Sequence, residues 1–122
     1  MTAPSSPPSP PPSPSPVVTG YRTRLLPGAA EAYRELHARV PEAVASKLRT
    51  AGVLSWTIWI DGDTLFHTIE TRASYEETIA ALDAIGPVDP AWDEAVAALV
   101  DPRPSSAALL PRVWTLDEAG QR

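Results

Sequence analysis

The chain has 122 residues, a net charge of −5 at neutral pH and no cysteine. This length suffices for one domain, the negative charge argues against nucleic acid and anionic membranes as partners, and the lack of cysteine excludes disulfides and thiolate chemistry. No apolar run approaches the roughly 20 residues of a membrane span, and no secretory signal pattern is present, so we expect a soluble cytoplasmic protein.

The N-terminal segment differs in composition from the rest of the chain. Residues 1–16 read MTAPSSPPSPPPSPSP and contain eight of the fifteen prolines but no charged side chain. Such a segment cannot bury enough apolar surface to offset the entropy of ordering it, so we predict a disordered or polyproline II arm. A single α+β domain is predicted over residues 17–118, with a frayed tail over residues 119–122.

The first predicted elements are a strand over residues 17–26 and a helix over residues 29–49, where apolar side chains recur at helical spacing. Pro41 interrupts the helix. It has no amide proton to offer the carbonyl of His37, and its ring crowds the preceding turn. We therefore predict a kink or a break just after His37.

The strongest strand pattern is VLSWTIWI at residues 53–60, followed by an Asp-Gly-Asp turn and a return strand over residues 65–71. Turn and capping residues delimit the elements that follow. These are two helices and a last strand, over residues 75–82, 90–100 and 112–116.

The predicted order, β-α-β-β-α-α-β, is that of the ferredoxin-like α+β fold, an antiparallel sheet with its helices on one face. Strand alternation places Val53 and Trp59 on the other face. These apolar side chains require a cover, and a second copy of the chain packed sheet against sheet is the simplest one. We therefore predict a homodimer.

His37 is the first candidate for a catalytic residue. It follows Tyr33 by four positions, so the two side chains lie one turn apart on the same helix face, which also carries Leu36 and Val40. An inward imidazole with a pKa near neutral can give or take protons. The alternative, a histidine satisfied within the core, is the more common arrangement on pattern alone.

Four segments in order resemble the L-rhamnose mutarotase family: YRELHARV, AGVLSWTIWIDGDTLFHTIE, PAWDEAVAALVD and RVWTLDE, within residues 18–118. The resemblance implies a dimeric α+β barrel enzyme that interconverts the α and β anomers of L-rhamnose or a related aldose, without metal or cofactor. It implies that His37 is the proton donor and that Tyr33, Trp56 and Trp92 contact the sugar. Trp56 stands where the family usually has tyrosine, and Ala91 where it has the first of two tryptophans.

The residues suit this chemistry on their own. Mutarotation requires one group to protonate the ring oxygen of the sugar and another to remove the proton of the anomeric hydroxyl, each contributing about 10²–10⁴-fold to the rate. His37 can provide the proton, and its partner is either water or a carboxylate that the sequence does not single out. A small neutral sugar also suits a chain without a basic patch.

Two other functions remain open: a cofactor-free monooxygenase-like enzyme on the same fold, and a non-catalytic small-molecule binding protein. For Trp92, a core position and a pocket position are equally compatible with the pattern. Without the resemblance, the strand pattern predicts that Trp56 is a core residue. Trp59 is assigned to the dimer face. His67, among apolar strand residues, is assigned no role.

Overall fold

The computed structural model describes residues 15–122, so most of the predicted N-terminal arm lies outside the described residues. No helix in the described part is long and apolar enough to cross a bilayer. The elements in chain order are β1 (Val17–Arg24), α1 (Ala30–His37), α2 (Glu42–Ala51), β2 (Val53–Asp61), β3 (Thr64–Thr71), α3 (Tyr75–Ile85), α4 (Pro90–Ala97), the 3-10 turn η1 (Pro104–Ser106), β4 (Ala108–Leu110), β5 (Leu116–Asp117) and β6 (Gly120–Gln121).

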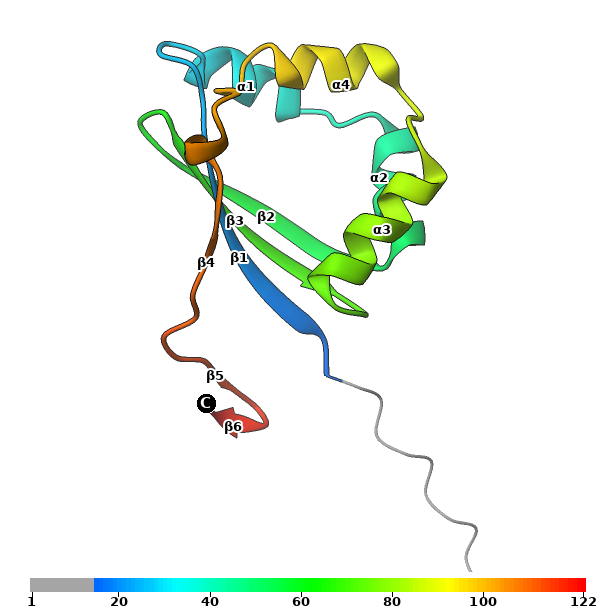
Figure 1. Ribbon diagram of the computed structural model, residues 1–122, viewed down its shortest axis with the longest axis vertical. Helices are drawn as coiled ribbons and strands as arrows, with labels where there is room; N and C mark the ends of the chain where they lie inside the picture. Colours follow the sequence, from blue (N-terminus) through cyan, green and yellow to red (C-terminus); the bar gives the residue numbers. More distant parts are fainter. Residues whose placement is uncertain (1–14) are drawn as a thin grey trace, which may run out of the picture.

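The main sheet has four strands in the order β2-β3-β1-β4, and every neighbouring pair is antiparallel. The helices lie on one side of this sheet, with α1 and α4 near one end and α2 and α3 beside each other near the other (Figure 1). The predicted ferredoxin-like α+β architecture is confirmed.

The predicted helix over residues 29–49 is two helices. Helix α1 ends at His37 and α2 begins at Glu42, after Pro41 in an extended conformation. The break occurs where it was predicted, because Pro41 cannot donate to a carbonyl of the preceding turn. As a result α2 runs in a different direction from α1 (Figure 1).

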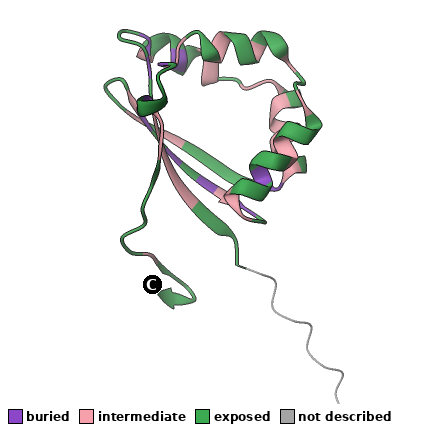
Figure 2. Ribbon diagram, in the orientation of Figure 1, coloured by how far each residue is buried: buried purple, intermediate pink, exposed green. Residues whose placement is uncertain are grey.

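The main buried cluster lies where β1, α1 and β3 meet. Leu25, Ala29, Tyr33 and Leu65 form it. Burial is sparse elsewhere, and most of the helix surface and the outlying chain is exposed (Figure 2). This cluster anchors α1 against the sheet and thereby places the residues at the end of α1.

The prediction that Val53 of β2 lies on the outer face of the sheet is wrong. A bulge between Val53 and Ser55 shifts the register against β3, and Val53 is buried instead of lying on the outer face. A bulge adds one residue to a strand, so the alternation before it is out of step with the alternation after it. Trp59, beyond the bulge, lies on the outer face and is 62% exposed.

The predicted last strand over residues 112–116 is wrong. The edge strand is β4, which pairs with β1, and the chain leaves the sheet at Pro111. Proline cannot donate to a strand ladder, so pairing ends there. The chain then runs away from the sheet (Figure 1), with Val113 97% exposed. Residues 119–122, expected to be frayed, include β6, which pairs with β5.

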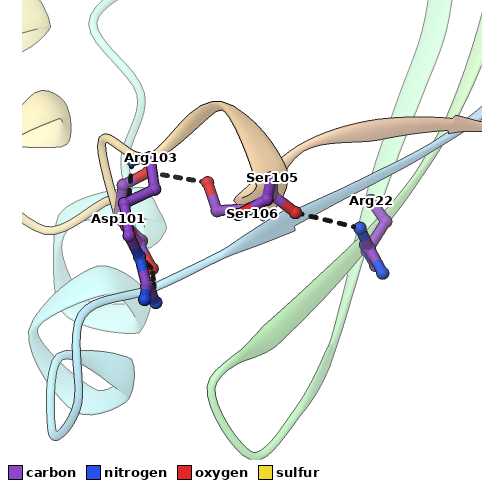
Figure 3. A network of polar contacts seen from close by, with 5 residues as sticks. All are labelled: Arg22, Asp101, Arg103, Ser105 and Ser106. Carbon is purple, nitrogen blue, oxygen red and sulfur yellow. Dashed lines mark hydrogen bonds and ion pairs between the residues drawn. The ribbon is translucent and has the colours of Figure 1, made fainter.

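A polar network fixes the connection from α4 to the edge strand (Figure 3). The carboxylate of Asp101 is buried and accepts hydrogen bonds from Arg103, which lower its pKa. Ser106 donates to the Asp101 carbonyl at 2.8 Å, and Arg22 on β1 donates to the Ser105 carbonyl. The turn is thus tied to β1, which brings β4 alongside it.

Candidate functional site

A cavity of about 370 Å³ lies between the helices and the inner face of the sheet. This volume falls within the range of roughly 300–1,000 Å³ that is usual for small-molecule sites. The cavity is mostly apolar, with a few polar groups contributed by α1 and by the sheet. Its lining includes all four residues that the sequence singled out, Tyr33, His37, Trp56 and Trp92, from three separate elements.

Tyr33 and His37 lie one turn apart on α1, with their rings stacked at a centroid distance of 4.0 Å and an angle of 25°. The Nδ1 atom of His37 lies 3.1 Å from the Tyr33 carbonyl oxygen. A carbonyl oxygen only accepts, so Nδ1 carries the proton and donates it. In the neutral ring, Nε2 is therefore the nitrogen with the free lone pair.

Burial sets the protonation state of both side chains. Desolvation lowers the pKa of His37 below its ordinary value of 6.5, and the bond to the Tyr33 carbonyl opposes this only in part. His37 is therefore mainly neutral at pH 7. Burial raises the pKa of Tyr33 to about 12, so its phenol stays protonated and able to donate.

Trp92 reaches the cavity from the first turn of α4. The Asp89 side chain accepts a hydrogen bond from the Trp92 amide at 3.0 Å and caps the helix. The indole ring meets the His37 ring edge-on, with centroids 5.1 Å apart and an angle of 63°. Trp92 thus lines the cavity beside the imidazole, as the pocket placement predicts.

Trp56 and His67 form a hydrogen-bonded pair on the inner face of the sheet. The Trp56 indole N–H donates to His67 Nδ1 at 3.1 Å, and His67 Nε2 lies 2.8 Å from Thr23 Oγ1. His67 is 7% exposed. Burial, and secondly the proximity of His37, lower the pKa of His67 to about 4, so the ring stays neutral.

His67 and Thr23 are site residues that the sequence analysis missed. The signal lay in the hairpin register: Trp56 pairs with Ile69, which makes His67 its diagonal neighbour on the same face. Counting outward from the Asp-Gly-Asp turn could have found this pair. Thr23 lies on β1, far from both in sequence, and no local pattern pointed to it.

A second hollow of about 490 Å³ lies between the β1 and β4 strands and the start of α3. It is more open than the first, and its lining includes Tyr75 and Arg112 but no imidazole. The cavity beside His37 is therefore the candidate site.

Comparisons with known proteins give similarities in sequence and in fold. Residues 19–116 match the family model described as rhaM, L-rhamnose mutarotase, whereas no curated protein matches the chain. A crystal structure of L-rhamnose mutarotase FA22100 from Formosa agariphila aligns with a TM-score of 0.65 at 20% identity, over 83% of this chain and 99% of that one. PA3566 from Pseudomonas aeruginosa aligns with a TM-score of 0.48 at 19% identity, over 83% and 97%.

Proposed function

The chain belongs to the L-rhamnose mutarotase family, enzymes that act on carbohydrates, and we propose that the cavity beside His37 is where it interconverts the α and β anomers of L-rhamnose or a related aldose. The observation that carries this proposal is the meeting of Tyr33, His37, Trp56 and Trp92 around one cavity. An imidazole with a free Nε2 lone pair borders a space that accommodates a small ring.

Ring opening removes the proton of the anomeric hydroxyl, breaks the bond between the anomeric carbon and the ring oxygen, and adds a proton to the ring oxygen. From the sequence, we expected His37 to protonate the ring oxygen during opening. In neutral His37 the proton is on Nδ1, bonded to the Tyr33 carbonyl, so we propose instead that Nε2 takes the anomeric proton and that water or another acid protonates the ring oxygen. Closure on the other face of the carbonyl reverses both transfers. The His37 imidazolium then returns its proton to the carbonyl oxygen, so His37 is the base in opening and the proton donor in closure.

The other lining residues bind and orient the sugar. The faces of Trp56 and Trp92 suit the apolar C–H faces of a pyranose ring, and the Tyr33 phenol donates to a sugar oxygen. The apolar part of the lining, which includes Val44 and Leu48, suits the methyl group of a 6-deoxy sugar. These contacts explain how a neutral, largely polar ligand is held without charged groups.

We also propose that the protein is a homodimer in the cytoplasm, with the outer faces of two sheets packed together. Trp59 and Phe66 are directly paired on that face and are 62% and 37% exposed, and Val18 and Leu110 are exposed as well. Large apolar side chains gathered on one sheet face are typical of an interface. The cavity lies on the opposite face, so this arrangement leaves it accessible.

Exchange NMR on L-rhamnose tests the proposed function. The protein should accelerate exchange between the two anomers, and His37→Ala should lose most of that acceleration while keeping its melting temperature. Arg39→Ala, an exposed neighbour on the same segment, is the matched control. Full activity in His37→Ala would remove the assignment.

The same experiment distinguishes the alternatives. Sugar binding without faster exchange would indicate a binding protein. No binding to any 6-deoxyhexose, together with uptake of an aromatic compound, would favour a monooxygenase-like enzyme.

A further inference from the structure

The hydrogen bonds around His67 have only one possible direction. The Trp56 indole N–H can only donate, so His67 Nδ1 accepts from it at 3.1 Å. A neutral imidazole carries one proton, which must then sit on Nε2. That nitrogen lies 2.8 Å from Thr23 Oγ1 and therefore donates to it.

This direction determines what Thr23 can offer to the cavity. Its oxygen accepts the bond from His67, so its own proton remains available for another acceptor. Thr23, His67 and Trp56 all line the cavity that holds His37. A sugar in that space presents hydroxyl oxygens, which accept hydrogen bonds.

We propose, on the basis of the proposed function, that His67 is a positioning residue that directs the Thr23 hydroxyl proton into the cavity and fixes the Trp56 indole, so that Thr23 donates a hydrogen bond to one hydroxyl of the sugar. His67 itself does not need to touch the sugar, because both of its ring nitrogens are engaged. Thr23 is then a specificity-determining contact, since a sugar without that hydroxyl leaves a partly buried donor unpaired.

The surroundings of His67 keep its ring neutral, and the neutral ring fixes the direction of its two hydrogen bonds. Among the residues that the structure describes, no carboxylate lines the cavity, so no anion on that side favours the charged ring. The aromatic and titratable groups around His67 are Tyr21, with ring centroids 5.5 Å apart, Trp56 at 5.9 Å and His37, whose charge also acts on it. The Thr23 hydroxyl contacts Nε2 and is uncharged. Burial among these groups lowers the pKa of His67 to about 4, so that the ring remains neutral near pH 7.

The first experiment examines the wild-type protein without sugar, so it does not depend on a variant that folds. Nitrogen-15 NMR of the imidazole distinguishes the tautomer protonated at Nε2 from the one protonated at Nδ1. We expect the His67 signals to show the Nε2-protonated form, unchanged between pH 5.5 and pH 8. The Nδ1-protonated form, or protonation of the ring within that interval, would overturn the proposal.

The second experiment measures KM and kcat for anomer exchange in Thr23→Val, which keeps the shape but removes the hydroxyl. One lost hydrogen bond corresponds to a rise in KM of about 3- to 10-fold, with a smaller change in kcat. Thr23→Ser should restore the wild-type KM. With a set of monodeoxy sugars, the penalty should vanish for the one analogue that lacks the partner hydroxyl. A penalty of equal size for every analogue, or none for L-rhamnose, would overturn the role of Thr23.

Two further variants separate the bonds of His67. His67→Gln keeps an N–H that can reach Thr23, whereas His67→Asn keeps an acceptor near the Nδ1 position for the Trp56 indole. We expect His67→Gln to keep KM within about 2-fold of wild type and His67→Asn to reproduce the KM of Thr23→Val. The reverse order would overturn the proposal.

These results remain distinguishable from a failure of the proposed function. If the wild type does not accelerate anomer exchange, sugar binding is measured as Kd in place of KM. If that Kd shows the expected dependence on Thr23, only the proposed function fails. If the wild type binds none of these sugars, the Thr23 contact is overturned together with the proposed function, whatever the tautomer of His67.

Discussion

Acid should destabilise this protein through His67 in particular. The ring is buried, and its pKa is about 4 in the folded state against 6.5 when unperturbed. Between these two values the unfolded chain binds a proton that the folded chain does not. The stability associated with neutral His67 is therefore present in full above about pH 6.5 and is lost as the pH falls toward 4.

The size of the effect follows from the two pKa values. The interval from 6.5 to about 4 corresponds to roughly 3 kcal/mol in the free energy of unfolding, at about 1.4 kcal/mol per pKa unit. On the order of 2–3 kcal/mol of this should be lost between pH 7 and pH 4.5. For a domain of about a hundred residues, a loss of 1 kcal/mol lowers the melting temperature by about 4–8 °C.

Urea unfolding followed by tryptophan fluorescence at pH 7 and pH 4.5 measures the loss, with His67→Gln as the matched variant because glutamine does not titrate. The lowered pKa values of His37 and Asp101 also reduce stability in acid, but they do so in both proteins. The difference between the two pH dependences therefore isolates His67. An equal loss in wild type and His67→Gln would refute the reasoning.

Four other predictions concern catalysis, binding, assembly and the arm. The value of kcat/KM for anomer exchange should be level above about pH 6.5 and fall at lower pH, because opening needs neutral His37 and its pKa is lowered; a rate that rises in acid would contradict this. Trp92→Ala should weaken sugar binding about 10-fold in a titration, with little change in melting temperature, and the opposite pattern would make Trp92 a core residue. Trp59→Glu should convert the dimer to a monomer in light scattering, whereas a wild type that is already monomeric at micromolar concentration argues against the interface. Deleting residues 1–16 should change neither the exchange rate nor the melting temperature, and a loss of either would show that the arm contributes.

Local rules explain why much of this protein could be predicted from its sequence. Strand alternation and helical spacing predicted the early elements, and the chemistry of proline predicted the break after His37. The four-residue spacing of Tyr33 and His37 fixed their shared helix face. The resemblance to a known family then added Trp56 and Trp92, which the structure places at the same cavity.

Only the tertiary structure decided the features that depend on register and on long-range pairing. The bulge near Val53 and the pairing of β4 with β1 depend on the neighbouring strand and not on the residues alone. The contact of His67 with Trp56 and Thr23 joins three strands, and its hydrogen-bond direction exists only once those strands are in register. Periodicity shows which face a side chain takes, but not which side chain it meets there, because the partner is set by how the strands align.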